Sequence, residues 1–269
     1  MHISSKLRLG ALALAISTLA ASPSFAQADV DAVAATVTPQ NGFWTNPSEP
    51  GGIGLVLEAH GVGEIFSSLM TYDSTNRAIW YVIQTRTVNG TEIGELQQFV
   101  GGQSLNRTDR EGIFLAYVGT ASFSFDTPTT GTLTLPTGAM PIARQNIIAN
   151  GVASGPAAGA PSAGWWYNLS ESGRGYFLEA QGSSLSFKGM MYDDLGQATW
   201  YSAEGAMTTP TLFTGTLTNT FGGQTMGGSY RLPTQSTNHG TITIQFTSDT
   251  TATLTNPAGR QIPIIRYTF

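Results

Sequence analysis

A short segment beginning at Asn168 combines several groups that can hydrogen-bond or carry charge. Its sequence, Asn-Leu-Ser-Glu-Ser-Gly-Arg-Gly, contains an amide, two hydroxyls, a carboxylate and a guanidinium in a glycine-bounded loop. Trp165 and Trp166 lie three and two residues before its first residue. Aromatic faces beside planar hydrogen-bonding groups are what a sugar or another small polar ligand requires. The segment is therefore a candidate binding site.

We predict a ligand-binding site formed by this loop and by aromatic residues on later strands. The predicted residues are Trp165, Trp166, Asn168, Glu171, Ser172, Arg174, Tyr192 and Trp200. A related segment earlier in the chain supplies the equivalents Trp44, Asn46, Glu49 and Trp80. The earlier segment has Pro50 in place of Ser172 and Gly52 in place of Arg174. The later segment is therefore favoured as the site.

A purely structural interpretation of the same residues stays open. The loop can hydrogen-bond to itself, with Asn168 forming an Asx turn and Glu171 pairing with Arg174. Trp165 and Trp166 are adjacent, so on a strand they point to opposite faces. One of them can lie in the core, which leaves the other for a surface or a pocket. The tryptophans of the later strands can also be core residues.

Each candidate segment is followed by a glutamate and, much later in the chain, by an arginine, at matching positions. Glu58 and Glu179 each lie in an early strand, and Arg144 and Arg266 each lie in a final strand. Half-buried charges are seldom left unpaired. We therefore expect Glu58 to pair with Arg144, and Glu179 with Arg266, where the first and last strands of each unit meet.

The sequence offers little for catalysis. It has no cysteine, no Gly-x-Ser-x-Gly motif and no histidine pair at metal-binding spacing. One alternative is a secreted hydrolase that uses Glu171 and Glu179 as acid and base. Residues 193–196, Asp-Asp-Leu-Gly, lack EF-hand spacing and predict a hairpin turn. We favour a non-catalytic function and expect no metal and no cofactor.

The two candidate segments belong to a long internal repeat. Residues 42–51, Gly-Phe-Trp-Thr-Asn-Pro-Ser-Glu-Pro-Gly, align with residues 164–173, Gly-Trp-Trp-Tyr-Asn-Leu-Ser-Glu-Ser-Gly. Further matches follow in order, with slips of one residue: 57–61 with 178–182, 72–73 with 192–193, 78–81 with 198–201, 101–103 with 222–224, and 141–144 with 263–266. The repeat predicts two copies of one domain, at 42–145 and 164–269.

The segments outside the two copies have different characters. Residues 146–163 are rich in glycine, alanine and proline and predict a flexible linker. Residues 27–41 predict a flexible tail. Residues 1–26 combine Lys6 and Arg8, an apolar stretch and a Pro-Ser-Phe-Ala cleavage site, which indicates a secretory signal peptide. We therefore expect export to the periplasm or the outside of the cell, and no transmembrane helix in the mature chain.

The overall charge argues against two classes of partner. Charged residues make up 11% of the chain, with 17 acidic and 12 basic side chains. An acidic surface with so few basic groups cannot neutralise a row of phosphates, so nucleic acid and anionic membranes are disfavoured. We expect a small polar ligand or a glycan as the partner; the sequence does not indicate an oligomeric state.

Alternation of apolar and polar residues dominates both copies. Residues 213–218 and 241–247 alternate strictly, and Gly, Asn, Asp and Pro clusters interrupt the pattern at short intervals. The pattern predicts an all-β protein with two small up-and-down barrels of seven or eight strands, or alternatively a β-sandwich. A closed barrel is favoured because it removes exposed strand edges.

The string in residues 164–179, Gly-Trp-Trp-Tyr-Asn-x-Ser-Glu-Ser-Gly-Arg-Gly-Tyr-x-x-Glu, resembles a recurring domain of exported proteobacterial proteins. The resemblance covers both copies and implies export and an accessory or binding role. A weaker resemblance is to avidin-like barrels, carried by Gly164, Trp166, Tyr167, Asn168, Ser172, Leu185, Gly189 and Tyr192. It implies that Asn168, Ser172 and Tyr192 line a pocket at the barrel mouth. The charged loop departs from that family, and biotin is not predicted.

We therefore expect a secreted or periplasmic binding module for a carbohydrate or other small polar ligand. The hydrolase is one alternative. An outer-membrane-associated barrel or a structural surface protein is another, since Ile265, Tyr267 and Phe269 resemble the final strand of outer-membrane barrels.

Overall fold

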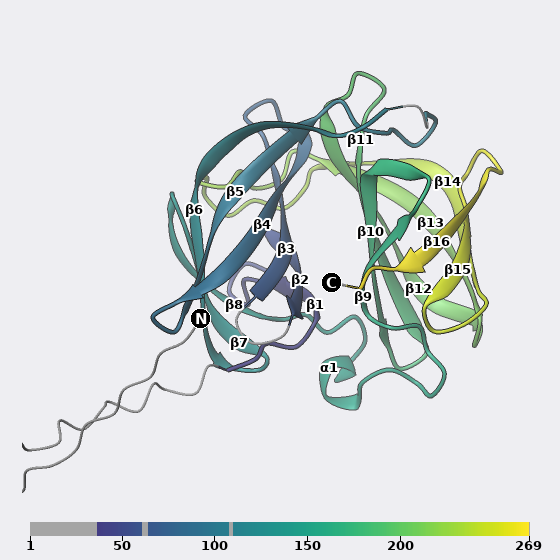
Figure 1. Ribbon diagram of the computed structural model, residues 1–269, viewed down its shortest axis with the longest axis horizontal. Helices are drawn as coiled ribbons and strands as arrows, with labels where there is room; N and C mark the ends of the chain where they lie inside the picture. Colours follow the sequence, from purple (N-terminus) through teal and green to yellow (C-terminus); the bar gives the residue numbers. More distant parts are fainter. Residues whose placement is uncertain (1–36, 61–63, 108–109, 269) are drawn as a thin grey trace, which may run out of the picture. The chain divides into compact units, whose positions relative to one another are not determined.

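The structure is a computed structural model that describes residues 37–60, 64–107 and 110–268. The predicted signal peptide and most of the predicted tail lie outside this part, as does the side chain of Ser172. The described chain consists of sixteen strands and one short helix (Figure 1).

The first eight strands form a closed antiparallel barrel, which we call barrel 1. Its strands are β1 (Gly42–Thr45), β2 (Gly54–His60), β3 (Glu64–Tyr72), β4 (Ala78–Val88), β5 (Thr91–Val100), β6 (Ile113–Thr127), β7 (Thr130–Leu135) and β8 (Gly138–Arg144). Each strand pairs with the next one in the chain, and β8 pairs back with β1 through Trp44 and Arg144.

The last eight strands repeat this arrangement as barrel 2. Its strands are β9 (Gly164–Asn168), β10 (Glu171–Gln181), β11 (Ser184–Tyr192), β12 (Ala198–Thr209), β13 (Leu212–Phe221), β14 (Gln235–Phe246), β15 (Thr251–Thr255) and β16 (Gln261–Arg266). Strand β16 pairs with β9 through Ile265 and Tyr167, which closes the barrel. The prediction of two tandem up-and-down barrels is confirmed, and the β-sandwich alternative is wrong.

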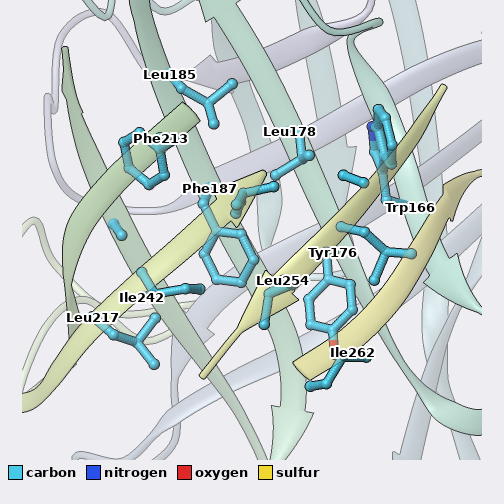
Figure 2. Close-up of a cluster of buried hydrophobic side chains, with 14 of the residues drawn as sticks. Trp166, Tyr176, Leu178, Leu185, Phe187, Phe213, Leu217, Ile242, Leu254 and Ile262 are labelled. Atoms are coloured by element: carbon cyan, nitrogen blue, oxygen red, sulfur yellow. The ribbon is translucent and has the colours of Figure 1, made fainter. Parts of the chain in front are cut away.

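Each barrel is filled by the apolar half of its alternating strands. In barrel 2 the inward side chains form one buried cluster, part of which Figure 2 shows converging from several strands: Trp166, Tyr176, Leu178, Leu185, Phe187, Phe213, Leu217, Ile242, Leu254 and Ile262. Barrel 1 has a matching cluster around Trp44, Leu55 and Leu57. Burial of these side chains stabilises each barrel from within, and no disulfide contributes, since the chain has no cysteine.

A third buried cluster lies between the barrels. It takes Phe43, Val56, Met70, Ile79 and Trp80 from barrel 1 and Trp165, Phe177, Met190, Tyr192 and Ala198 from barrel 2. The alternation explains how it arises: Leu55 and Leu57 point into barrel 1, so Val56 between them points outward. The outer faces of β2 and β10 are therefore apolar as well, and the two barrels bury them against each other.

Two ion pairs join the barrels and correct the expected pairing. Arg144 Nη2 lies 2.6 Å from Glu179 Oε1, and Arg266 forms an ion pair with Glu58. Each arginine thus binds the glutamate of the other copy, and the expectation that Glu58–Arg144 and Glu179–Arg266 close the individual barrels is wrong. The reason is the strand alternation, because a glutamate two residues after an outward-facing apolar residue also faces outward.

The ion pairs are extended by reciprocal backbone hydrogen bonds. Glu179 Oε2 accepts a hydrogen bond from Phe43 N at 2.7 Å, and Glu58 Oε2 accepts one from Trp165 N at 2.8 Å. These backbone groups follow the glycines that open each copy, Gly42 and Gly164. A Cβ on either glycine would overlap the arginine and glutamate beside it. The repeated glycine is therefore needed for contact between the barrels.

The repeated Gly-Gly-Gln loops, residues 101–103 and 222–224, also bind the opposite barrel. Tyr72 N donates to Gln224 O at 3.2 Å, and Tyr192 N donates to Gln103 O at 3.1 Å. A Cβ on Gly223 would overlap the Tyr72 ring, and a Cβ on Gly102 would overlap the Tyr192 ring. Much of the repeated sequence therefore encodes how one copy packs on the other.

The connection between the barrels, residues 146–163, differs from the expected flexible linker. It contains the helix α1 (Gly151–Ser154) and is hydrogen-bonded to barrel 2. Ala157 N donates to Gly182 O at 2.9 Å, and Gly182 N donates to Gly155 O at 2.8 Å. Small residues suit this segment because they let its backbone lie directly against β10.

Candidate functional site

A cavity of about 440 Å³ lies where the two barrels meet. Its lining comes from both copies: Phe66, Ser68, Trp80, Val82, Gln84, Phe99 and Gly112 from barrel 1, and Trp165, Trp166, Tyr167, Gly173, Arg174, Gly175, Met190, Tyr192 and Tyr267 from barrel 2. Neither barrel forms this cavity alone. Its volume falls in the range typical of small-molecule sites.

The barrel 1 side of the cavity is the outer face of β3, β4 and β5. Phe66 is paired with Gln84, and Ser68 with Val82, in the register of β3 and β4. Because partners in an antiparallel pair point to the same face, these four side chains form one surface. Phe99 on β5 extends it, with its ring centroid 6.2 Å from that of Trp80.

The barrel 2 side is formed by the start of β9 and by the charged loop. The Trp165 ring packs edge-on against Phe66 and Phe177, with centroid distances of 5.2 Å and 5.5 Å. It lies above Gly175, where a Cβ would stand 3.4 Å from the ring. Because Gly175 has no side chain, the Trp165 ring has room to lie over it beside the cavity.

Three buried polar atoms around the cavity have no hydrogen-bond partner within the described residues. They are Ser68 Oγ, Trp165 Nε1 and Arg174 Nε. Their residues are at least nine-tenths buried, so bulk water does not compensate them. An unsatisfied buried polar group costs about 1–3 kcal/mol. A ligand that accepts hydrogen bonds from these groups would recover part of that cost.

Glu171 and Arg174, expected in a loop, lie at the start of strand β10, where one carboxylate and two guanidinium groups come together. Glu171 forms ion pairs with Arg174 and with Arg260. Arg174 also donates from Nη1 to Ser104 O of barrel 1 at 3.2 Å. The loop is thus held against the other barrel as well as against itself. With both arginines protonated and Glu171 ionised, the three side chains carry a net charge of plus one.

Tyr192 forms the part of the cavity wall nearest the Gly-Gly-Gln loop of barrel 1. Its ring packs edge-on against Trp80, with a centroid distance of 5.5 Å. Burial raises the pKa of the Tyr192 hydroxyl well above its usual range, so it stays protonated at neutral pH. Trp80 is itself fixed by hydrogen bonds from Nε1 to Met191 O at 3.0 Å and Thr199 O at 2.9 Å.

The cavity brings together five of the predicted site residues: Trp80, Trp165, Trp166, Arg174 and Tyr192. Trp80 was assigned to a separate site in the first copy, yet it contributes to the same cavity as the residues of the second copy. Trp166 is fully buried and belongs mainly to the core of barrel 2. Its equivalent Trp44 has the same place in barrel 1.

Apart from Ser172, the remaining predicted residues lie outside the cavity lining. Asn168 forms an Asx turn by accepting a hydrogen bond from Ser170 N at 2.8 Å. Its equivalent Asn46 accepts one from Ser48 N at 3.0 Å. Glu49 contacts barrel 2 by accepting from Gln224 Nε2 at 3.0 Å.

The last aromatic residue in the predicted set, Trp200, lies at the counterpart of the Trp80 position. Its ring packs edge-on against Tyr72, with a centroid distance of 6.0 Å. Ser172 belongs to β10, and the structure describes nothing of its side chain.

Sequence reasoning missed the barrel 1 side of the cavity. Phe66, Val82 and Phe99 look like ordinary strand residues, and nothing in their spacing indicates a site. The two copies nevertheless differ in polarity at these three positions. At the matching positions of the second copy stand the polar residues Ser186, Ser202 and Thr220.

The two glutamates of the hydrolase alternative are not arranged as an acid–base pair. Both lie on β10, eight residues apart in sequence, which is about 26 Å along an extended strand. Carboxylates that flank one glycosidic bond lie within about 10 Å of each other. Glu171 binds two arginines, whereas Glu179 binds Arg144 and Gln181.

Within residues 37–60, 64–107 and 110–268, no three His, Cys, Asp or Glu side chains are grouped so that they could hold a metal ion. The helix in the described part of the chain is too short to span a membrane. None of the protein families, curated proteins and solved structures compared with this chain matches it.

Proposed function

We propose that this chain is an exported, non-catalytic binding protein whose site is the cavity between the two barrels. The ligand is a small molecule with an apolar or aromatic part that packs on Trp165, Phe66 and Trp80. It also carries oxygen atoms that accept hydrogen bonds. The observation that carries the proposal is an aromatic-lined cavity with three buried polar atoms around it that have no hydrogen-bond partner among the residues that the structure describes.

The surroundings of the cavity support binding more than catalysis. Its only carboxylate neighbour in the charged loop, Glu171, is neutralised by two arginines. Both of its oxygen atoms bind guanidinium groups. The lining instead combines aromatic surface with a few polar groups, which is the usual composition of a binding pocket.

Export is part of this proposal and follows from the amino-terminal sequence. Residues 1–26 have the three-part order of a secretory signal. The cavity would then meet ligands of the periplasm or of the medium.

The test is a binding survey followed by a variant that fills the cavity. Tryptophan fluorescence and calorimetry with the full mature chain would use anilinonaphthalene sulfonate, benzoate, cellobiose and dodecanoate as probes. We expect saturable binding of at least one probe. Ser68→Leu should lower its affinity at least tenfold, because the added side chain occupies the cavity.

Lys188→Leu is the matched control, since Lys188 has the equivalent position in barrel 2 and lies outside the cavity. It should leave the affinity unchanged. Equal effects of the two substitutions, or no saturable binding of any probe, would contradict the proposal. Circular dichroism of both variants establishes that they are folded.

A further inference from the structure

The start of β6 exposes an unusual run of large apolar side chains. Ile113, Phe114, Leu115 and Tyr117 are 62%, 44%, 53% and 60% exposed. We call these four residues the β6 strip. Single exposed apolar residues are common on proteins, but four large ones within five residues of one strand, two of them in ring contact, indicate a binding surface.

The β6 strip is continuous with the cavity through aromatic contacts. Phe99, which lines the cavity, has its ring centroid 5.9 Å from that of Phe114. The ring centroid of Phe114 in turn lies 4.7 Å from that of Tyr117. With Trp80 packed on the other side of Phe99, four rings lead from the interior of the site to the surface. One ligand can therefore contact both.

The fold does not require apolar residues at these positions. In barrel 2 the corresponding strand β14 begins with Gln235, Ser236, Thr237 and Asn238. Ser236 is paired with Thr220, as Phe114 is paired with Phe99. The same barrel thus closes with polar residues at this place. The β6 strip is an additional property of barrel 1, and a ligand or partner is needed to explain it.

The polar end of the site favours a negatively charged group. Trp165 Nε1 and Arg174 Nε are buried donors without partners among the described residues. Glu171, Arg174 and Arg260 together leave one positive charge uncompensated among themselves. A carboxylate in the cavity balances this charge, and as an acceptor it forms stronger hydrogen bonds than a neutral oxygen does.

We propose that the ligand is a carboxylate-bearing amphiphile with an apolar chain, such as a medium-chain fatty acid. The carboxylate lies in the cavity near Arg174 and Trp165, and the chain leaves past Phe99 and lies along the β6 strip. This inference rests on the proposed binding function and adds the chemical class of the ligand. A bilayer with anionic lipids fits less well, because the chain has 17 acidic and only 12 basic side chains.

Isothermal titration of the full mature chain with fatty acids of different length tests the proposal. Each buried methylene removes further apolar surface from water, so dodecanoate should bind at least a hundredfold more tightly than butyrate. Dodecyltrimethylammonium, which has the same chain and a cationic head, should bind at least tenfold more weakly than dodecanoate. Equal affinities for the two heads would overturn the assignment of a carboxylate.

The β6 strip is tested by giving it the residues of barrel 2. The double variant Phe114→Ser, Tyr117→Asn should weaken dodecanoate binding at least tenfold and leave benzoate binding unchanged. Leu195→Ser, at a side chain that is 85% exposed elsewhere, is the control and should have no effect. If the double variant binds dodecanoate as tightly as the wild type, the amphiphile proposal fails, although the cavity can still bind other ligands.

The proposed function and the further inference fail in different ways. Loss of dodecanoate binding in the β6 strip variant, without any loss in Ser68→Leu, would mean that the surface binds and the cavity does not. That outcome contradicts the proposed function. Binding of the chain to phosphatidylcholine vesicles without binding of monomeric dodecanoate would overturn the amphiphile and make the β6 strip a membrane contact.

Discussion

The two barrels meet in two matched regions that contain different side chains. In the first region, Trp165 of barrel 2 faces Phe66 and Ser68 of barrel 1, and the cavity lies beside them. In the second region, Phe43 of barrel 1 faces Lys188 of barrel 2, whose Nζ lies 5.2 Å from the ring centroid. Lys188 also forms an ion pair with Glu204, with Nζ 2.6 Å from Oε1.

The two regions have the same strand pairing and differ in their side chains. Ser186 is paired with Glu204 in barrel 2 as Phe66 is paired with Gln84 in barrel 1. The second region shows that a lysine and a glutamate can fill this place. In the first region, small or uncharged residues leave a cavity with unpaired polar atoms, which costs stability. A cost without structural need supports a functional use of the cavity.

The largest effect is expected for the ion pairs that both regions share. Replacing Arg144 by methionine leaves Glu179 buried and uncompensated, which should lower the free energy of unfolding by about 3–5 kcal/mol. The double variant Arg144→Met, Glu179→Gln should lose clearly less than the sum of the two single variants. Urea unfolding of the full chain measures all three.

The control for this cycle is Arg266→Met combined with Glu179→Gln, which tests the pair expected from the sequence. These two losses should be additive, because Arg266 binds Glu58 instead. A stronger coupling of Glu179 to Arg266 than to Arg144 would show that the ion pairs close individual barrels.

A smaller loss is expected where the Gly-Gly-Gln loops bind the opposite barrel. A Cβ on Gly102 would overlap the Tyr192 ring, so Gly102→Ala should cost about 1–3 kcal/mol. Gly223→Ala should cost a similar amount through Tyr72. Gly54→Ala is the control, because its Cβ would meet its nearest neighbour at an ordinary 3.6 Å. Similar thermal stability of Gly102→Ala and the control would contradict the importance of this contact.

Giving the first region the side chains of the second should change ligand binding more than it changes the free energy of unfolding. The double variant Ser68→Lys, Gln84→Glu gives the first region the ion pair of the second. Partly exposed ion pairs contribute up to about 1 kcal/mol, so the free energy of unfolding should change by no more than that. The new lysine should occupy the cavity and abolish probe binding. Retained binding would place the ligand elsewhere.

The smallest effect concerns the neighbours of the two ion pairs. His60 lies beside the Glu58–Arg266 pair, whereas Gln181 stands at the matching place beside Glu179 and donates to it at 2.7 Å. Burial and the Arg266 charge lower the pKa of His60 to about 4. The unfolded chain therefore binds more protons below about pH 6.5, and His60 lowers stability as the pH falls from there towards 4.

The test compares the wild type with His60→Gln, which places the residue of the second copy in the first. Because His60 is only partly buried, the difference between pH 7 and pH 4.5 should stay below about 1 kcal/mol. The variant should lose less stability on acidification than the wild type. An identical pH dependence of both proteins would mean that His60 titrates alike in the folded and unfolded states.

The alternation of apolar and polar residues was enough to predict two closed barrels, because it depends on local spacing that the fold preserves. The partners of Glu58 and Glu179 could not be predicted in the same way. The alternation shows that a side chain faces outward, as with Val56 and Glu58, but it does not show what covers that face. A strand shows the same alternation whether its outward-facing charges pair within one barrel or across two packed barrels.

The residues that line the cavity could be predicted only in part. Trp165 and Arg174 stand out by type, and they do line the cavity. Phe66, Val82 and Phe99 become part of it only because another barrel lies opposite them. Their difference from Ser186, Ser202 and Thr220 is the one clue in the sequence, and its meaning depends on knowing that the two copies face each other.

Each barrel binds the other through the same groups, an arginine and a Gly-Gly-Gln loop. This is the form of an isologous interface, in which both partners use the same surface. A chain with a single copy could form a homodimer through these contacts, and two-fold symmetry would make its two ligand cavities identical. Joining both copies in one polypeptide removes that constraint. Ser68 and Lys188 can then differ, so one cavity stays open while its counterpart strengthens the assembly.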